Sequence, residues 1–279
     1  MRILVANDDG IYSPGIAALA TAARQFAEVR IVAPDVEQSS AGHAITASKP
    51  LWYRRTHVVD DIEAWRVNGT PADCVALGVH QWEGVDLVLS GINLGPNLGN
   101  AMWHSGTLAA AKQAALLGIR GVALSTLVVD EEVDFDALTP FVVRTLELLV
   151  PRHDLRLVNV NLPPHPRGMV WTQQAVRRYN GSVVPGVDPM GRHHFWFTVV
   201  PLTENEPGTD LWAVEREYVS ITPLRLDLTD HASLERLRTE LPLDAAHADQ
   251  EPAPRIADVP EDDEAAGQTR PDGAGARVG

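Results

Sequence analysis

Short apolar runs alternate with amphipathic stretches along the first half of the chain. The runs are typical of strands buried on both faces of a parallel sheet; they cover residues 2–6, 28–33, 86–90, 121–124 and 155–161. The stretches between them have apolar residues at helical spacing and cover residues 16–26, 70–79, 108–117 and 135–149. This alternation predicts an α/β fold with a doubly wound, mostly parallel, Rossmann-like sheet. Residues 51–59 and 64–67 add a hairpin-like excursion.

The pattern changes after Pro163-Pro164. Short β-like runs separated by Gly and Pro replace the alternation, and we expect no clear helix before a final one at 233–239; the runs are residues 169–172, 194–200 and 218–222. Residues 244–279 hold nine acidic residues, three arginines and almost no large apolar side chain, which indicates disorder. We therefore expect three parts: an α/β core at 1–162, a β-rich extension with its helix at 163–243, and a disordered acidic tail at 244–279.

Two adjacent carboxylates follow the first predicted strand, in the tetrapeptide Asn7-Asp8-Asp9-Gly10. Ser13 and Pro14 then predict a helix start, with Ser13 as the N-cap. Ligands bind at the carboxyl ends of strands in open α/β sheets. Asp8 and Asp9 converge there only if the chain turns, and Gly10 permits such a turn. Converging carboxylates repel unless a cation lies between them, which indicates a metal site. A solvated loop is the alternative.

Two further loops, at residues 36–46 and 91–107, should reach the same edge of the sheet. Their side-chain oxygen donors are the hydroxyls of Ser39 and Ser40 and the amides of Asn93 and Asn97. A set of oxygen donors with few carboxylates suits Mg²⁺, Mn²⁺ or Ca²⁺ better than zinc. The loops therefore extend the candidate metal site.

Ser105-Gly106-Thr107 precedes the alanine-rich helix predicted at 108–117. Free backbone amides, two hydroxyls and the positive end of the helix dipole make this an anion site, although ordinary helix capping is the alternative. A divalent cation beside an anion pocket is what phosphoryl chemistry needs. The competing Gly-x-x-x-x-Gly-Lys-Ser/Thr and Gly-x-Gly-x-x-Gly phosphate motifs are absent from the sequence.

Net charge and cysteine content restrict the classes of binding partner and the cellular compartment that fit this sequence. The net charge of −14 argues against a nucleic-acid polymer or an anionic membrane as partner. Cys74 is the single cysteine, which fits a reducing cytosol, and we see neither a signal peptide nor an apolar stretch long enough to span a bilayer. We therefore expect a cytoplasmic protein that takes a small anionic ligand.

A receiver-like phosphate- and metal-binding module without turnover is the second interpretation, because such modules also begin with paired acids. It would need an acceptor aspartate and a lysine at later strand ends. The two lysines, Lys49 and Lys112, do not end predicted strands, and Asp35 closes the second strand, where it is badly placed as acceptor. The enzyme interpretation is therefore preferred.

Ordered motifs along residues 1 to about 230 resemble those of the SurE (survival protein) family of nucleotidases. They are Asn7-Asp8-Asp9-Gly10, Ala33-Pro34-Asp35 with Ser39, residues 68–75 (NGTPADCV), residues 90–93 (SGIN) with 95–99 (GPNLG), Ser105-Gly106-Thr107, Gly208-Thr209-Asp210 and residues 218–224 (YVSITPL). Ser40, Asn100-Ala101, His104 and Gln113 depart from the family pattern. None of these departures removes an expected metal ligand.

The resemblance implies a metal-dependent phosphatase for nucleoside 5′- and 3′-monophosphates, sometimes also for short polyphosphate. It implies one divalent cation per subunit, held by Asp8, Asp9, Ser39 and Asn93. It also implies a homodimer or homotetramer formed through the extension, whose Trp171, Trp196 and Trp212 are typical of an interface.

We assign catalysis to Asp8 and Asp9, and phosphate binding to Asn97, Ser105, Gly106 and Thr107. Either aspartate could orient or deprotonate a metal-bound water that attacks phosphorus. A covalent aspartyl-phosphate on Asp8 is the alternative, and both routes stay open at this point.

Overall fold

The computed structural model of the protein describes residues 1–129, 132–176, 179–201 and 206–241. Residues 1–227 form one compact unit, and the residues from 228 onward belong to a second. In the second unit, α6 (His231–Glu240) begins after Asp230, whose carboxylate accepts a hydrogen bond from the Ser233 amide at 3.0 Å. The predicted final helix is thus confirmed, whereas the tail at 244–279 lies outside the described residues.

A nine-stranded sheet forms the centre of the first unit. Its strands are β1 (Arg2–Ala6), β2 (Glu28–Pro34), β3 (Tyr53–Thr56), β4 (Glu63–Val67), β5 (Leu87–Leu94), β6 (Arg120–Thr126), β7 (Leu157–Leu162), β8 (Gly168–Trp171) and β11 (Tyr218–Leu224). They lie in the order β3-β4-β2-β1-β5-β6-β7-β11-β8, and neighbours are parallel except for β3–β4 and β7–β11. The predicted doubly wound, mostly parallel sheet is confirmed.

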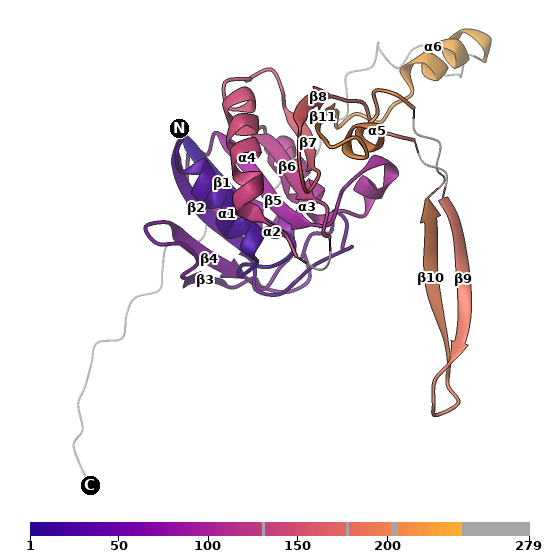
Figure 1. The fold of residues 1–279 in the computed structure, drawn as a ribbon, viewed down its shortest axis with the longest axis horizontal. Coiled ribbons are helices and arrows are strands. Elements are labelled where there is room, and N and C mark those ends of the chain that lie inside the picture. Colours follow the sequence, from indigo (N-terminus) through magenta and orange to yellow (C-terminus); the bar gives the residue numbers. More distant parts are fainter. Residues whose placement is uncertain (130–131, 177–178, 202–205, 242–279) are drawn as a thin grey trace, which may run out of the picture. The chain divides into compact units, whose positions relative to one another are not determined.

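Helices cover both faces of this sheet (Figure 1). They are α1 (Pro14–Ala23), α2 (Pro71–Gln81), α3 (Gly106–Leu116) and α4 (Phe135–Leu149). This unit also contains the 3₁₀ helix η1 (Gly99–Trp103) and the short helix α5 (Asp210–Val214). Ile3 and Val5 of β1 belong to the core cluster that includes residues of α1 and α4, while Leu4 and Ala6 belong to the cluster that includes residues of α2 and α3. Successive strand residues face opposite sides, so burial on both faces requires the continuous apolar run seen in the sequence. Among the described residues, none of these helices is long and apolar enough to cross a membrane.

The helices predicted to start at Thr70 and Ser13 both begin there, but only Thr70 caps its helix with its side chain. Thr70 and Asp73 form a capping box at the start of α2, with the Asp73 amide donating to Thr70 Oγ1 at 3.1 Å. Burial raises the pKa of Asp73, but hydrogen bonds from Thr46 and Thr70 outweigh it and leave that pKa below its ordinary value. Ser13 is the N-cap residue of α1 and Pro14 opens the helix, both as predicted, although the buried Ser13 Oγ makes no capping hydrogen bond.

Strand β5 is longer than predicted. The glycine- and asparagine-rich loop was expected to begin at Gly91, but β5 continues to Leu94. Its register against β6 shifts between Ser90 and Asn93, after which Asn93 pairs with Ser125. This irregularity lets polar residues continue the strand, and it carries Asn93 to the carboxyl edge of the sheet.

The chain after residue 162 forms two strands of the central sheet and a separate two-stranded sheet. β8 and β11 are the last two strands at one end of the nine-stranded sheet, so this sheet continues into the segment expected to be the extension. β9 (Tyr179–Val187), which was not predicted, and β10 (His193–Pro201) form a separate antiparallel pair (Figure 1). The expectation of no helix here is wrong, because Thr209 caps α5 by accepting from the Trp212 amide.

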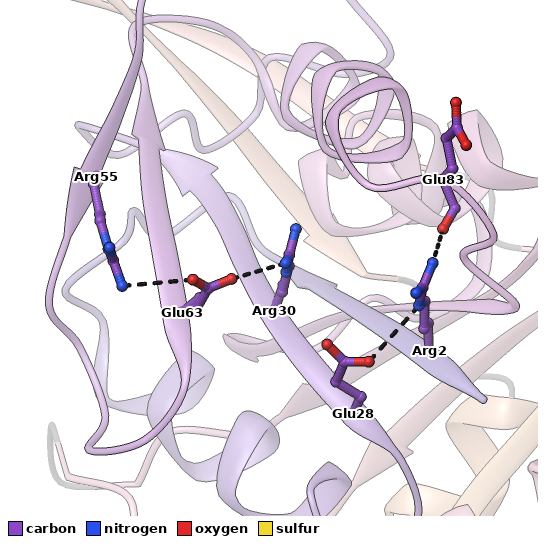
Figure 2. Close-up of polar contacts among 6 residues, drawn as sticks. All are labelled: Arg2, Glu28, Arg30, Arg55, Glu63 and Glu83. Atoms are coloured by element: carbon purple, nitrogen blue, oxygen red, sulfur yellow. Dashed lines mark hydrogen bonds and ion pairs between the residues drawn. The ribbon is translucent and has the colours of Figure 1, made fainter.

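Charged side chains near the amino ends of the strands form a series of ion pairs (Figure 2). Arg2 Nε lies 3.7 Å from Glu28 Oε2, and Arg30 Nη2 lies 2.9 Å from Glu63 Oε2. Arg55 approaches the other Glu63 oxygen at 3.5 Å. Such partly exposed pairs contribute at most about 1 kcal/mol each. These basic residues lie toward the edge of the sheet where β1, β2 and β4 begin, away from the carboxyl edge that carries the adjacent carboxylates.

Candidate active site

Asp8 and Asp9 lie at the carboxyl end of β1, where the strand order reverses. β1 pairs with β2 on one side and with β5 on the other, which is the position where ligands bind in doubly wound sheets. The predicted turn occurs at Gly10, with φ of +94°. Asn7 Nδ2 donates to the Gly10 carbonyl at 2.9 Å and fixes this turn. The chain therefore reverses directly after the two carboxylates.

The Asp8 carboxylate is held by the first turn of α3. Only 4% of Asp8 is exposed, and Thr107 Oγ1 donates to its Oδ1 at 2.7 Å. At Gly106, a Cβ atom would lie 2.8 Å from Asp8 Oδ2, so the close approach requires glycine. Burial raises the pKa of Asp8, and hydrogen bonds from the Thr107 hydroxyl and amide partly offset this rise. The positive end of α3 thus stabilises the Asp8 carboxylate.

Asp9 is half-buried and accepts a hydrogen bond from the Leu94 amide at 3.1 Å. Burial is the main cause that raises the pKa of Asp9 to about 6, and the negative charges of Asp8 and Glu37 add to it. Among the described residues, neither aspartate forms an ion pair with a basic side chain. Two adjacent, poorly compensated carboxylates fit a divalent cation.

The other two predicted metal ligands lie next to Asp9. Ser39 lines the same pocket as Asp9 and donates from Oγ to Glu37 Oε1 at 2.6 Å. Asn93 Nδ2 donates to the Gly95 carbonyl at 2.6 Å, which leaves Oδ1 as its possible ligand atom. Groups of three or more His, Cys, Asp or Glu side chains suited to a metal are absent from the described residues. The predicted ligand set has only two such side chains, the carboxylates of Asp8 and Asp9, and adds two neutral oxygens. A set of oxygen ligands of this composition suits hard cations.

The loop at residues 36–46 connects the two sides of this site. The Gln38 amide donates to the Asp8 carbonyl at 2.8 Å, and the Gly42 amide donates to the His104 carbonyl at 3.1 Å. His104 immediately precedes the predicted anion site. The three loops expected to meet at the carboxyl edge therefore do meet.

The predicted phosphate ligands are mostly engaged within the protein. Ser105 Oγ accepts from the Leu108 amide at 3.0 Å, which is the capping role left open by the sequence. The fully buried Thr107 hydroxyl donates to Asp8 and accepts from Asn97 Nδ2 at 3.2 Å. Asn97 Nδ2 also donates to Ser125 Oγ at 2.7 Å. Phosphate binding by these side chains stays a prediction, and their observed contacts position Asp8.

A pocket of about 440 Å³ opens beside Asp9. Among the described residues that line it, Asp9, Asp35 and Glu37 are acidic and none is a lysine or an arginine. Tyr12 and Leu94 also line it, and the Tyr12 hydroxyl hydrogen-bonds to Thr56 Oγ1 at 2.8 Å. Tyr12 was not predicted as a site residue. In the sequence it only precedes the helix start at Ser13, and nothing there distinguishes it from a linker residue.

Comparison with known proteins agrees with the motifs. The family model described as "Survival protein SurE" matches residues 3–181. The chain belongs to the SurE family. The relative "5′-nucleotidase SurE 1" of Thermus thermophilus is 49% identical over 243 residues, which are 85% of this chain and 96% of the relative. "5′-nucleotidase SurE" of Deinococcus radiodurans is 44% identical over 252 residues, 86% of this chain and 93% of that one.

A SurE crystal structure supports the same assignment. The SurE protein from Aquifex aeolicus superimposes with a TM-score of 0.74 at 36% identity, and covers 86% of this chain and 99% of its own. The family resemblance predicted from the motifs is thus confirmed, and the SurE fold is that of the described α/β unit.

Proposed function

We propose that this SurE protein is a metal-dependent 5′-nucleotidase that hydrolyses nucleoside monophosphates to nucleoside and phosphate. Its relatives are named 5′-nucleotidases, and the chain aligns with more than nine-tenths of the two described above. The observation that carries the proposal is the pair Asp8–Asp9, placed at the strand-order reversal with no basic partner among the described side chains.

One divalent cation per subunit, Mg²⁺, Mn²⁺ or Ca²⁺, would be held by Asp8, Asp9, Ser39 and Asn93. When bound, such a cation neutralises phosphate charge and acidifies a water molecule. We assign the orientation of the attacking water to Asp9, because it is the more exposed carboxylate and lines the open pocket. Asp8, which is 4% exposed and held by Thr107, would keep the site in register.

The alternative nucleophile is Asp8 itself, and the stereochemistry at phosphorus separates the two routes. Direct attack by water inverts the configuration of a chiral phosphate ester, whereas a covalent aspartyl-phosphate gives net retention through two inversions. We expect inversion, because the Thr107 hydroxyl already occupies one Asp8 oxygen and the side chain is buried. Retention would support Asp8 as the nucleophile.

The pocket beside Asp9 would take the nucleoside. Its volume of about 440 Å³ falls in the range of small-molecule sites, which is about 300–1,000 Å³. Tyr12 and Leu94 offer apolar surface to a base, and Asp35 and Glu37 can accept hydrogen bonds from ribose hydroxyls. We extend the proposal to 3′-monophosphates, and we expect short polyphosphate to react more slowly because the same carboxylates repel a second phosphate.

Phosphate release from a panel of esters tests this function. We expect activity on nucleoside 5′-monophosphates that EDTA abolishes, that added Mn²⁺ or Mg²⁺ restores, and that Asp9→Asn lowers by orders of magnitude without unfolding the protein. A bis-aryl phosphodiester should react more slowly, because it presents fewer free oxygens and a second bulky group. Full activity in EDTA would refute metal dependence, and phosphate uptake without turnover would instead support a receiver-like module.

We also propose that the protein is at least a dimer, formed through its β-rich segment, and that it works in the cytoplasm. Phe195 and Trp196 of β10 are 69% and 66% exposed, and exposed aromatic area of this kind is typical of interfaces. The single buried Cys74 suits a reducing compartment. Light scattering at micromolar concentration tests the assembly, and a monomer would contradict it.

A further inference from the structure

Asp210, the first residue of α5, is a fully buried carboxylate that is bonded to three backbone amides. Its Oδ2 accepts from Gly99 at 2.8 Å, and its Oδ1 accepts from Ala175 at 3.0 Å and from Leu211 at 2.8 Å. In the part of the chain that the structure describes, no basic side chain forms an ion pair with it. The carboxylate thus joins three segments that are far apart in the sequence.

The backbone around Asp210 is fixed on both sides. The Asp210 amide donates to the Gln173 carbonyl at 2.9 Å. Gly99 has a φ of +54°, and a Cβ atom there would lie 2.7 Å from the Ala175 carbonyl oxygen. Gly99 is therefore pressed against the segment that Asp210 also binds, and a side chain at this position would force the two apart.

A chain of hydrogen bonds leads from this contact to the catalytic carboxylate. Two residues before Gly99, the Asn97 amide donates to Asn161 Oδ1 at 2.8 Å, and Asn159 Nδ2 donates to the Asn97 carbonyl at 2.8 Å. The Asn97 side chain donates to Thr107 Oγ1, which in turn donates to Asp8. Displacing the backbone at Gly99 would therefore move Asn97 relative to its partners.

The same segment continues into the start of α3. After Gly99, η1 leads to His104, whose carbonyl accepts from Gly42, and then to Ser105, which caps α3. Residues 97–105 thus form one stretch, which we call the 97–105 segment. Asn159 and Asn161 hold its beginning, and Asp210 holds its middle.

We propose that Asp210 is a positioning residue for the reaction, which fixes the 97–105 segment so that Asp8 and the first turn of α3 are set for phosphate. The inference rests on the proposed nucleotidase function. Asp210 touches neither Asp8 nor the pocket beside Asp9, so it acts through the segment and not on the substrate. The Gly208-Thr209-Asp210 motif thereby acquires a role in holding the 97–105 segment.

Asp210→Asn is the sharpest test, because it keeps the shape of the side chain. One amide oxygen can still accept from Ala175 and Leu211, but the NH₂ group then faces the Gly99 amide, and two donors repel. We expect the KM for a nucleoside monophosphate and the inhibition constant of inorganic phosphate to rise together by about tenfold, the effect of one lost hydrogen bond. We expect kcat to change by less than about threefold. Amide hydrogen exchange should quicken in the 97–105 segment.

Arg120→Met is the matched control for general destabilisation. Arg120 is buried and donates to the carbonyls of Leu149, Val150 and Arg152, so its loss disturbs the end of α4 and leaves the 97–105 segment untouched. We expect it to lower the melting temperature without changing KM or the phosphate inhibition constant. If Asp210→Asn behaves like Arg120→Met, the positioning role is overturned.

Gly99→Ala approaches the same contact from the other side and serves if Asp210→Asn does not fold. It should raise KM and the phosphate inhibition constant in the same way, and unchanged constants would overturn the inference. The wild-type protein separates this result from the proposed function. No hydrolysis of nucleoside monophosphates by wild type refutes the nucleotidase proposal, whereas active wild type with unaffected variants overturns only the role of Asp210.

Discussion

Replacing Thr107 with valine removes one hydroxyl group between α3 and Asp8 and leaves the shape of the side chain almost unchanged. That hydroxyl is fully buried, donates to Asp8 Oδ1 at 2.7 Å and accepts from Asn97 Nδ2 at 3.2 Å. A hydrogen bond to a charged group contributes about 1.5–3 kcal/mol, and a buried group left without its partner costs about 1–3 kcal/mol. We therefore expect Thr107→Val to lower the free energy of unfolding by about 2–3 kcal/mol.

Urea unfolding in EDTA measures this loss without any contribution from bound metal. Thr107→Ser is the matched control, since it keeps the hydroxyl and removes one methyl group, which costs about 1 kcal/mol. Since the Thr107 hydrogen bond lowers the pKa of Asp8, its loss should also raise that pKa and weaken divalent-cation binding. A valine variant as stable as the serine variant, with unchanged cation affinity, would refute the claim that α3 holds Asp8.

Three further predictions concern charge and chain length. Because the pKa of Asp9 is raised from 3.8 to about 6, the metal-free protein should lose stability as pH rises from about 4 to about 6. Partial exposure of Asp9 limits this loss of stability to about 1–2 kcal/mol. Calorimetry should find a smaller loss in Asp9→Asn. Glu37→Gln should raise kcat/KM for a nucleoside diphosphate relative to the monophosphate, and an unchanged ratio would contradict repulsion in the pocket. Deleting residues 244–279 should leave melting temperature and activity unchanged, since the segment offers little apolar surface to bury.

Local signals were sufficient where neighbours in the sequence decide the structure. The apolar runs predicted the parallel strands, and the Thr70–Asp73 capping box is a four-residue pattern with its own physics. The turn at Gly10 follows from the same kind of local constraint. Residues 8 and 9 were therefore placed at the sheet edge correctly from the sequence.

Contacts between distant segments were not predictable in this way. Ser105-Gly106-Thr107 has the composition of an anion site, yet in the fold its donors meet Asp8, which lies 99 residues from Thr107. The irregular end of β5 escaped prediction because its residues look like a loop until they pair with β6. Nothing local in the sequence indicates that Asp210 binds Gly99, since the partners are 111 residues apart. Composition thus indicated the chemistry of the site, and tertiary pairing decided which groups remain available to a ligand.

Phosphate and cation should bind to this site cooperatively. The Thr107 hydroxyl and amide are directed at Asp8, and the Leu108 amide is bonded to Ser105, so an arriving phosphate meets a carboxylate and few free donors at the start of α3. Repulsion between a phosphate dianion and Asp8 falls once a divalent cation compensates the carboxylates. Calorimetric titration with inorganic phosphate should therefore give at least about tenfold weaker binding in EDTA than with saturating Mg²⁺, and linkage requires phosphate to tighten Mg²⁺ binding by the same factor. Equal phosphate affinity with and without the cation would show that α3 binds phosphate unaided.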